Sequence, residues 1–159
     1  MRYDCHDIRR QDRLLDESRA RELLQVGEYG VLSMATEQGG YGVPINYAGV
    51  GDTLYMHCAP EGRKLRAIGA DERVSFCVVG HSRVVSANFT TEFESVIAHG
   101  RARLVEAEDE RRMALRAIVE KYSAEHIAEG LKAIERSIYR TAIIAIAVDS
   151  FSGKIKKGL

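Results

Sequence analysis

The segment Tyr55–Leu65 brings together residue types that could bind a phosphate group. A predicted strand ends at His57 and Cys58, a glycine-bearing loop follows, and a short predicted helix opens with Arg63 and Lys64. The N–H groups of a first helical turn have no partner within the helix, so they attract anions, here beside two cations. A solvated helix start with two surface cations fits the same spacing, so both interpretations stay open.

Pro44 marks a second place where the backbone could meet a ligand. It lies in the predicted strand 41–47, which follows strand 29–36 and the turn 38–40 as an antiparallel partner. Because proline has no N–H group, the strand should lie at an edge, at a bulge, or where its backbone faces something other than another strand.

The histidines and cysteines do not suggest a metal site or a disulfide framework. The sequence contains no HxH, HExxH or CxxC pattern, and its three cysteines favour a reducing compartment. His57 and Cys58 are neighbours on a strand and point to opposite faces, which disfavours Cys58 as a nucleophile with His57 as its base. Cys77 fits an inert core position, and His99 fits an ordinary barrel histidine.

The order of predicted elements favours an antiparallel sheet over a parallel one. Helices are predicted at 16–26, 63–70, 106–122 and 124–136, and strands at 29–36, 41–47, 53–58, 73–79, 83–86, 94–104 and 141–148. This meander lacks βαβ alternation and the GxGxxG fingerprint of a dinucleotide-binding fold. The sequence therefore predicts a mainly β protein, an antiparallel barrel with peripheral helices.

Composition narrows the class of protein further. The 159 residues fit one domain, 1–159, and 23 basic residues balance 23 acidic ones for a net charge of zero. This balance gives no electrostatic footprint for nucleic acid, and no apolar run is long enough to cross a membrane. We therefore expect a cytoplasmic protein that binds neither nucleic acid nor membranes.

An ordered series of motifs resembles a known family. The series is Tyr41–Tyr47 (YGVPINY), Leu54–Lys64 (LYMHCAPEGRK), Arg73–Phe76, Glu94–Ala102, the step Lys121-Tyr122-Ser123 and the strand ending near Ser152-Gly153-Lys154. In this order the motifs resemble the nitroimidazole-resistance family, within the pyridoxamine-phosphate-oxidase-like flavoproteins. The resemblance spans most of the chain and implies an antiparallel split β-barrel of the FMN-binding type. It also implies a homodimer with FMN in a groove at the interface.

The resemblance assigns roles to individual residues by position. Arg63 and Lys64 would hold the FMN phosphate, and the strand Val43, Pro44, Ile45, Asn46 would present backbone groups to the flavin ring. His57 and Cys58 would lie beside the phosphate or ring, and Ser95 with Val96 would approach the flavin, some of these from the other subunit. His57 also matches a histidine associated with the active site, so it could donate a proton or orient the substrate.

The chain departs from the vitamin oxidases of this group. Ser95 stands where those enzymes tend to carry glutamine, and the tail 154–159 lacks their tryptophan and Arg-Leu ending. The resemblance therefore implies an FMN-dependent reductase of a small electron-poor substrate such as a nitroimidazole. A reduced nicotinamide or another donor would supply the electrons.

Two alternatives to a reductase stay open at this point. One is a non-catalytic split-barrel protein that binds flavin, or haem with His57 or His99 as axial ligand. The other is a dimeric scaffold without any ligand. FMN is distinguished from haem by its need for the cations Arg63 and Lys64.

Overall fold

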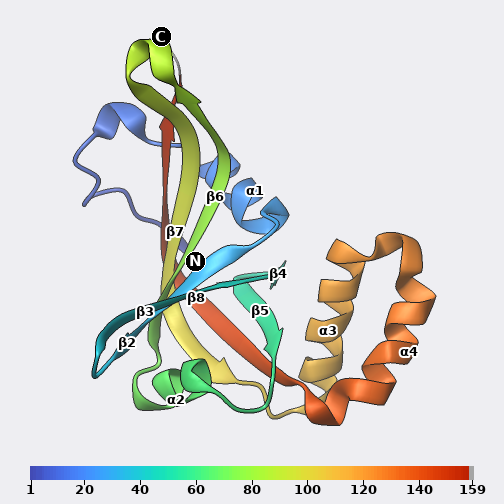
Figure 1. The fold of residues 1–159 in the computed structure, drawn as a ribbon. Coiled ribbons are helices and arrows are strands. Elements are labelled where there is room, and N and C mark those ends of the chain that lie inside the picture. The colour runs from blue at the N-terminus through green and yellow to red at the C-terminus, as the bar shows by residue number, and fades with distance from the viewer. Residues whose placement is uncertain (158–159) are drawn as a thin grey trace.

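One large sheet dominates the fold, described for residues 1–157 by a computed structural model (Figure 1). The strands are β1 (Arg2–Tyr3), β2 (Gly30–Thr36), β3 (Gly39–Ile45), β4 (Ala48–Val50), β5 (Thr53–Cys58), β6 (Arg73–Val85), β7 (Thr90–Leu104) and β8 (Ala142–Lys156). The helices are α1 (Glu17–Val26), α2 (Arg63–Ala70), α3 (Glu108–Tyr122) and α4 (Ile127–Ser137). Short 3₁₀ turns lie at Gln11–Arg13, Ser86–Asn88, Ala124–His126 and Ile138–Arg140.

The sheet forms a split barrel, as the sequence predicts. Its strand order is β3-β2-β6-β7-β8-β5-β4, with β1 added in parallel beside β8 and the other pairs antiparallel. The edge strands β3 and β4 follow each other along the chain, joined only by Asn46 and Tyr47. Over residues 1–157 no ladder joins these two edges, so the barrel stays open along one seam, which we call the split.

The barrel interior is filled by alternate residues of the strands, because strand side chains point to opposite faces in turn. Fully buried examples are Leu32, Phe76 and Val96. The apolar faces of α1 and α2 pack on the same core through Ala20, Leu23, Leu24, Ala67 and Ile68.

The hairpin of α3 and α4 lies beside the barrel and builds a second core (Figure 1). Tyr55 of β5 and Ile143 and Ala145 of β8 face it from the outer side of the sheet, against Leu115 and Ile134 of the helices. The two helices therefore cover β5 and β8 near one end of the split.

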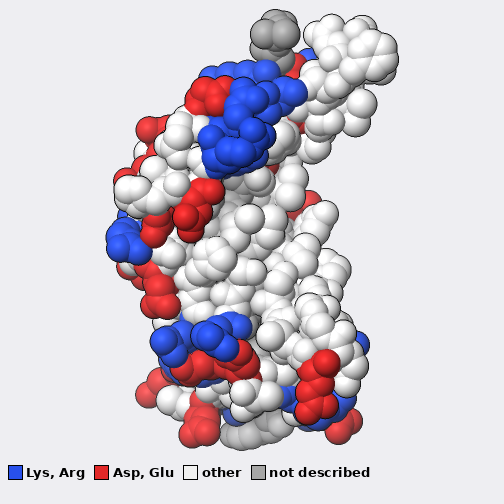
Figure 2. All heavy atoms as spheres, turned by 90° about the vertical axis from the view of Figure 1, so that its left-hand side faces the viewer, with Lys and Arg blue, Asp and Glu red and all other residues white. Residues whose placement is uncertain are grey.

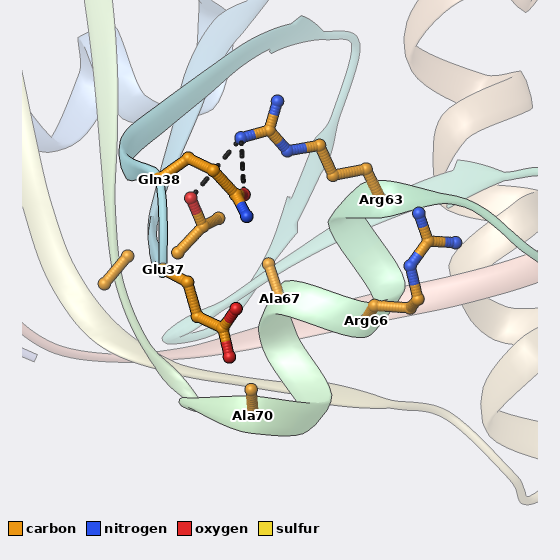
Figure 3. Close-up of a pocket in the computed structure, with 8 residues that line it drawn as sticks. Glu37, Gln38, Arg63, Arg66, Ala67 and Ala70 are labelled. Carbon is orange, nitrogen blue, oxygen red and sulfur yellow. Dashed lines mark hydrogen bonds between the residues drawn. The ribbon is translucent and has the colours of Figure 1, made fainter.

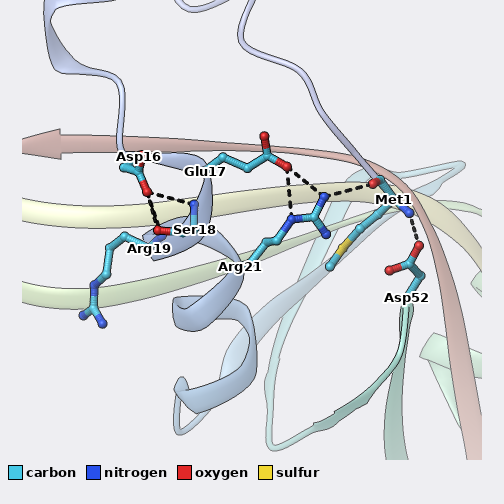
Figure 4. A network of polar contacts seen from close by, with 7 residues as sticks. All are labelled: Met1, Asp16, Glu17, Ser18, Arg19, Arg21 and Asp52. Atoms are coloured by element: carbon cyan, nitrogen blue, oxygen red, sulfur yellow. Dashed lines mark hydrogen bonds and ion pairs between the residues drawn. The ribbon is translucent and has the colours of Figure 1, made fainter.

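Helix α1 is fixed at its start by a network of polar contacts (Figure 4). The Asp16 carboxylate caps the helix by accepting from the backbone N–H groups of Ser18, at 2.9 Å, and Arg19, at 3.3 Å. Arg21 pairs with Glu17 and donates to the Met1 carbonyl oxygen at 3.3 Å.

Two expected strand ends are wrong. The turn expected at 80–82 is a bulge, since β6 continues from Val79 to Val85 with a register shift between Val79 and Ser82. Strand β8 continues past Val148 to Lys156 because it pairs with β7 as far as Phe93. The long ladder β6-β7-β8 therefore extends beyond the barrel toward the C-terminal end (Figure 1).

Charge is unevenly distributed over the molecule. Figure 2 shows Lys and Arg side chains gathered at the upper end and again, together with Asp and Glu, at the lower end, with a largely uncharged area on the right of the region between them. None of the helices within 1–157 is long and apolar enough to cross a membrane.

Candidate functional site

Two unpaired strand edges flank the split. Strand β3 pairs only with β2, so its other edge carries no ladder within the described chain. In β5, Thr53–Tyr55 pair with β4, whereas His57 and Cys58 pair only with β8. The unpaired edge of His57 and Cys58 is the same edge of β5 that β4 covers at Thr53–Tyr55, so it faces the split. Backbone N–H and C=O groups on both sides are thus available to a ligand.

Pro44 lies in β3, which is an edge strand. An edge is one of the three environments that the sequence predicts for this proline. Val43 and Ile45 pack toward the barrel core, while Pro44 is exposed on the outer face. A groove of about 360 Å³ beside the strand is lined by Pro44, Ile45, Asn46, Glu28 and Tyr29. The predicted ring-facing strand therefore borders open space.

The start of α2 is an uncapped helix terminus. Gly62 stands at the N-cap position with a φ of 139°, a backbone conformation that favours glycine, and no side chain caps the helix. Arg66 N–H donates to the Gly62 carbonyl at 3.2 Å, which leaves the earlier N–H groups of the turn for solvent or a ligand. This geometry fits the expected anion site.

Arg63 reaches from this helix start across a cleft of about 570 Å³ toward the β2–β3 turn (Figure 3). Arg66 lines the same cleft, but its side chain is directed away from that turn. The Arg63 guanidinium lies 4.3 Å from the centre of the Tyr41 ring. It donates to Thr36 Oγ1 at 3.4 Å and Gln38 Oε1 at 3.5 Å. Hydrogen bonds this long are weak, so the guanidinium can turn toward an anion at little cost.

Lys64 lies on a different side of α2 from Arg63. It does not line the cleft of Arg63, and its charge acts on Cys58, where it partly offsets the effect of burial. Burial raises the pKa of the Cys58 thiol, so this group stays protonated at neutral pH. Cys58 is therefore a poor nucleophile, as the sequence predicts.

His57 is exposed at the end of β5, while Cys58 is half-buried on the opposite face of the strand. The imidazole lies at the free edge described above, next to the loop that leads into α2. The His57 side chain is exposed on the face of β5 that Tyr55 shares, which is the outer face of the sheet. His99 is exposed on the outer face of β7, away from this edge.

Ser95 and Val96 lie apart from the other predicted site residues. Val96 is fully buried inside the barrel, so its side chain contacts no surface ligand. Ser95 faces outward and pairs with Val79 of β6 and Lys154 of β8, beyond the part of β6 that pairs with β2. Within one chain, the structure does not bring Ser95 to the start of α2.

Sequence reasoning missed Thr36, Gln38 and Tyr41, which surround the Arg63 guanidinium. The predicted hairpin placed them around one turn, but nothing in the sequence showed that this turn faces α2. Tyr41 and Asn46 lie five residues apart on or just after β3, which corresponds to roughly 17 Å of strand. An extended ligand along this edge could contact Arg63 at one end and the groove of Pro44 at the other.

The sequence matches a family model, and the fold is similar to that of solved structures. Residues 16–155 match the family described as Pyridoxamine 5'-phosphate oxidase. A candidate 5-nitroimidazole antibiotic resistance protein from Bacteroides thetaiotaomicron aligns with a TM-score of 0.71 and 22% identity, covering 90% of this chain and 86% of that one.

Two further structures share the fold. The FAD and haem binding protein from Mycobacterium smegmatis aligns with a TM-score of 0.77 and 21% identity over 90% of this chain and 72% of that one. An FAD-binding protein from Mesorhizobium loti aligns with a TM-score of 0.65 and 22% identity over 91% and 98%. Among curated proteins, none matches the sequence.

Proposed function

Because the chain belongs to the Pyridoxamine 5'-phosphate oxidase family, we propose that it binds FMN in the split and reduces a small electron-poor substrate such as a nitroimidazole. The observation that carries this proposal is the split itself. Two unpaired strand edges flank it, and an uncapped helix start with Arg63 stands at one end. These features suit a planar ring that carries hydrogen-bonding groups and a terminal phosphate.

The donor set fits a mononucleotide flavin. Arg63 from the side of the cleft and Lys64 from the side of Cys58 flank the first N–H groups of α2, and these groups would hold one phosphate between them by charge-assisted hydrogen bonds. The backbone of Val43–Asn46 would face the polar edge of the ring. We favour FMN over FAD because the described residues offer one such phosphate site at the split, although FAD is the flavin named for three proteins of similar fold.

FMN, when bound, would supply the hydride and electron transfer. The chain's own residues would position the substrate and supply a proton. Reduction of an acceptor by a hydride equivalent also requires a proton, and His57 is an exposed titratable side chain at the split. A reduced nicotinamide is the proposed donor. The protonated Cys58 takes no part as a nucleophile.

We further propose a homodimer, because the outer face of the sheet carries uncharged surface. A row across β3, β2, β6, β7 and β8 contains Pro44, Val31, Cys77, Ile97 and Ser152. In the neighbouring part of the ladder Val79 is 58% exposed, and Ile97 itself is 41% exposed. A second copy seated here would stand beside Pro44 and the split, and its Ser95 would approach the flavin.

A cytoplasmic location is part of the same proposal. The three cysteines Cys5, Cys58 and Cys77 are free thiols in the structure. Free thiols persist in a reducing compartment, where reduced nicotinamides are also available to a reductase.

Equilibrium titration tests the cofactor assignment. The apoprotein is titrated with FMN while the flavin fluorescence is followed, and we expect saturable quenching at one FMN per chain. Mixing the loaded protein anaerobically with a reduced nicotinamide should bleach the flavin absorbance, and a nitroimidazole should restore it faster than it does with free FMN. Absence of FMN binding contradicts the assignment. Binding without either electron-transfer step contradicts the reductase.

A second candidate is a haem-binding protein, favoured by the structural likeness to a protein that binds both FAD and haem. His57 and His99 are both exposed and could each serve as an axial ligand. Titration with haemin decides between them: a Soret shift lost in His57→Ala or His99→Ala supports haem, and an unchanged spectrum rejects it.

A further inference from the structure

The end of the split is closed by two side chains from α3. Tyr47, which joins the edge strands β3 and β4, has no ladder partner for its backbone groups. The Tyr122 hydroxyl accepts from the Tyr47 N–H at 3.0 Å and lies 2.7 Å from the Tyr47 carbonyl oxygen. One side chain therefore supplies both contacts that a neighbouring strand would make.

The same hydroxyl reaches the segment between α1 and β2. It lies 2.6 Å from the Glu28 carbonyl oxygen, so its single proton is shared between this oxygen and that of Tyr47. The Asn46 side-chain amide donates to the Glu28 carbonyl at 2.9 Å. The contacts of Tyr122 thus join the two segments that line the groove beside Pro44.

Lys121 completes this closure from the neighbouring position. Its ammonium donates to the Gly27 carbonyl at 2.7 Å and lies 3.9 Å from the centre of the Tyr47 ring. Partial burial of Lys121 lowers the pKa of its ammonium to about 8. The Tyr47 ring itself is fully buried and packs edge-on against Phe76, with ring centres 4.7 Å apart.

We propose that Lys121 and Tyr122 are positioning residues that fix the end of β3 for the flavin ring, so that the α3–α4 hairpin is part of the cofactor site although it lies outside the barrel. The proposal rests on the proposed function in its reference to flavin. An edge strand with one neighbour, interrupted by Pro44, has few contacts of its own to hold its last residues. The contacts from α3 supply them.

Two substitutions separate positioning from simple packing. Tyr122→Phe keeps the ring and removes the hydroxyl, and Lys121→Met keeps most of the stem and removes the charge. We expect the dissociation constant for FMN to rise about tenfold in Tyr122→Phe, since a partly buried hydroxyl that satisfies backbone groups is lost. The visible circular dichroism of bound FMN should also change, because the ring is held differently.

One matched control lies on α3 and the other in the 3₁₀ turn Ile138–Arg140 that follows α4. Arg116→Met changes a 62% exposed side chain of α3 that pairs with Glu120, and Tyr139→Phe removes the hydroxyl of a tyrosine that is 77% exposed. Neither residue contacts Gly27, Glu28 or Tyr47. Both controls should bind FMN with unchanged affinity and an unchanged visible spectrum.

Hydrogen exchange of the apoprotein provides a readout that does not require flavin. We expect faster exchange of the Tyr47 amide in Tyr122→Phe and in Lys121→Met, with core strands such as β7 unaffected. If exchange at Tyr47 and the FMN spectrum both stay as in the wild type, the proposal is wrong. If the wild type binds no FMN, the proposed function is wrong, and the proposed cofactor role of Lys121 and Tyr122 is wrong with it. The exchange rate of the Tyr47 amide would still show whether Lys121 and Tyr122 hold this segment in place.

Discussion

Replacing Arg63 by alanine tests the phosphate site with little disturbance of the fold. The side chain is exposed, and its contacts with Thr36 and Gln38 are long, at 3.4 and 3.5 Å. Its position over Tyr41 is an exposed cation–π contact of roughly 0.5–1 kcal/mol. We therefore expect Arg63→Ala to lower the free energy of unfolding by less than about 1 kcal/mol.

The effect on FMN binding should be much larger. A guanidinium that donates to a phosphate contributes about 1.5–3 kcal/mol through charge-assisted hydrogen bonds. This free energy corresponds to a rise in the dissociation constant of roughly 10- to 150-fold. Riboflavin carries the same ring without the phosphate, so its affinity should change by less than about twofold, the scatter of independent sites.

The assay is fluorescence titration of the wild type, Arg63→Ala, Arg63→Lys and Arg66→Ala with FMN and with riboflavin. Arg66 lines the same cleft but points away from the β2–β3 turn (Figure 3), so Arg66→Ala separates a specific effect of the Arg63 guanidinium from general positive charge at the cleft. Arg63→Lys should recover part of the FMN affinity, because it keeps the charge but loses the planar donor pair.

An equal loss of affinity for FMN and riboflavin in Arg63→Ala would refute this reasoning. It would place Arg63 at the ring or in the fold, not at the phosphate. A loss of the same size in Arg66→Ala would show that general charge near the cleft, and not the Arg63 guanidinium, attracts the ligand.

Three further predictions concern the fold and the assembly. Gly100→Ala should lower the free energy of unfolding by about 3 kcal/mol in urea titrations, since the added Cβ would overlap the Ala147 carbonyl oxygen. Gly40→Ala is the control, because its Cβ meets nothing within 4 Å and should leave the free energy of unfolding nearly unchanged. The Glu94 carboxylate pairs with a guanidinium on α1, and this ion pair lowers the pKa of the carboxylate. The ion pair therefore stabilises the fold fully above the unfolded pKa of about 4.3, and this stabilisation is lost as the pH falls through the lower, folded pKa. Glu94→Gln should lower the free energy of unfolding by about 1 kcal/mol at pH 7 and should flatten its dependence on acid pH. Ile97→Lys places a charge on the outer sheet face and should halve the mass measured by light scattering; a monomeric wild type would contradict the proposed dimer.

Local patterns predicted the strands that position the site, and they did so for physical reasons. Pro44 cannot donate to a ladder, and it lies in an edge strand. The alternation around His57 placed its side chain and that of Cys58 on opposite faces, which the structure confirms. These properties depend on one residue and its immediate neighbours, so the sequence alone contains them.

Features that depend on distant contacts could not be predicted in this way. Gly80 is typical of a turn, but β6 continues through a bulge at this position. A Cβ at Gly80 would lie only 2.6 Å from the Glu94 carboxylate oxygen, so the space beside Gly80 is taken by a side chain from another strand. Tyr122 was part of a motif without an assigned role, because its partners at Glu28 and Tyr47 are far from it in the sequence.

The cofactor that the protein carries when it is isolated tests the proposed flavin site most directly. The decisive measurement is a visible absorption spectrum of the freshly purified protein, followed by chromatography of the compound released on heating. We predict a flavin spectrum and release of FMN. A haem Soret band, or a colourless protein that takes up no added FMN, would contradict the proposal that the split is a flavin site.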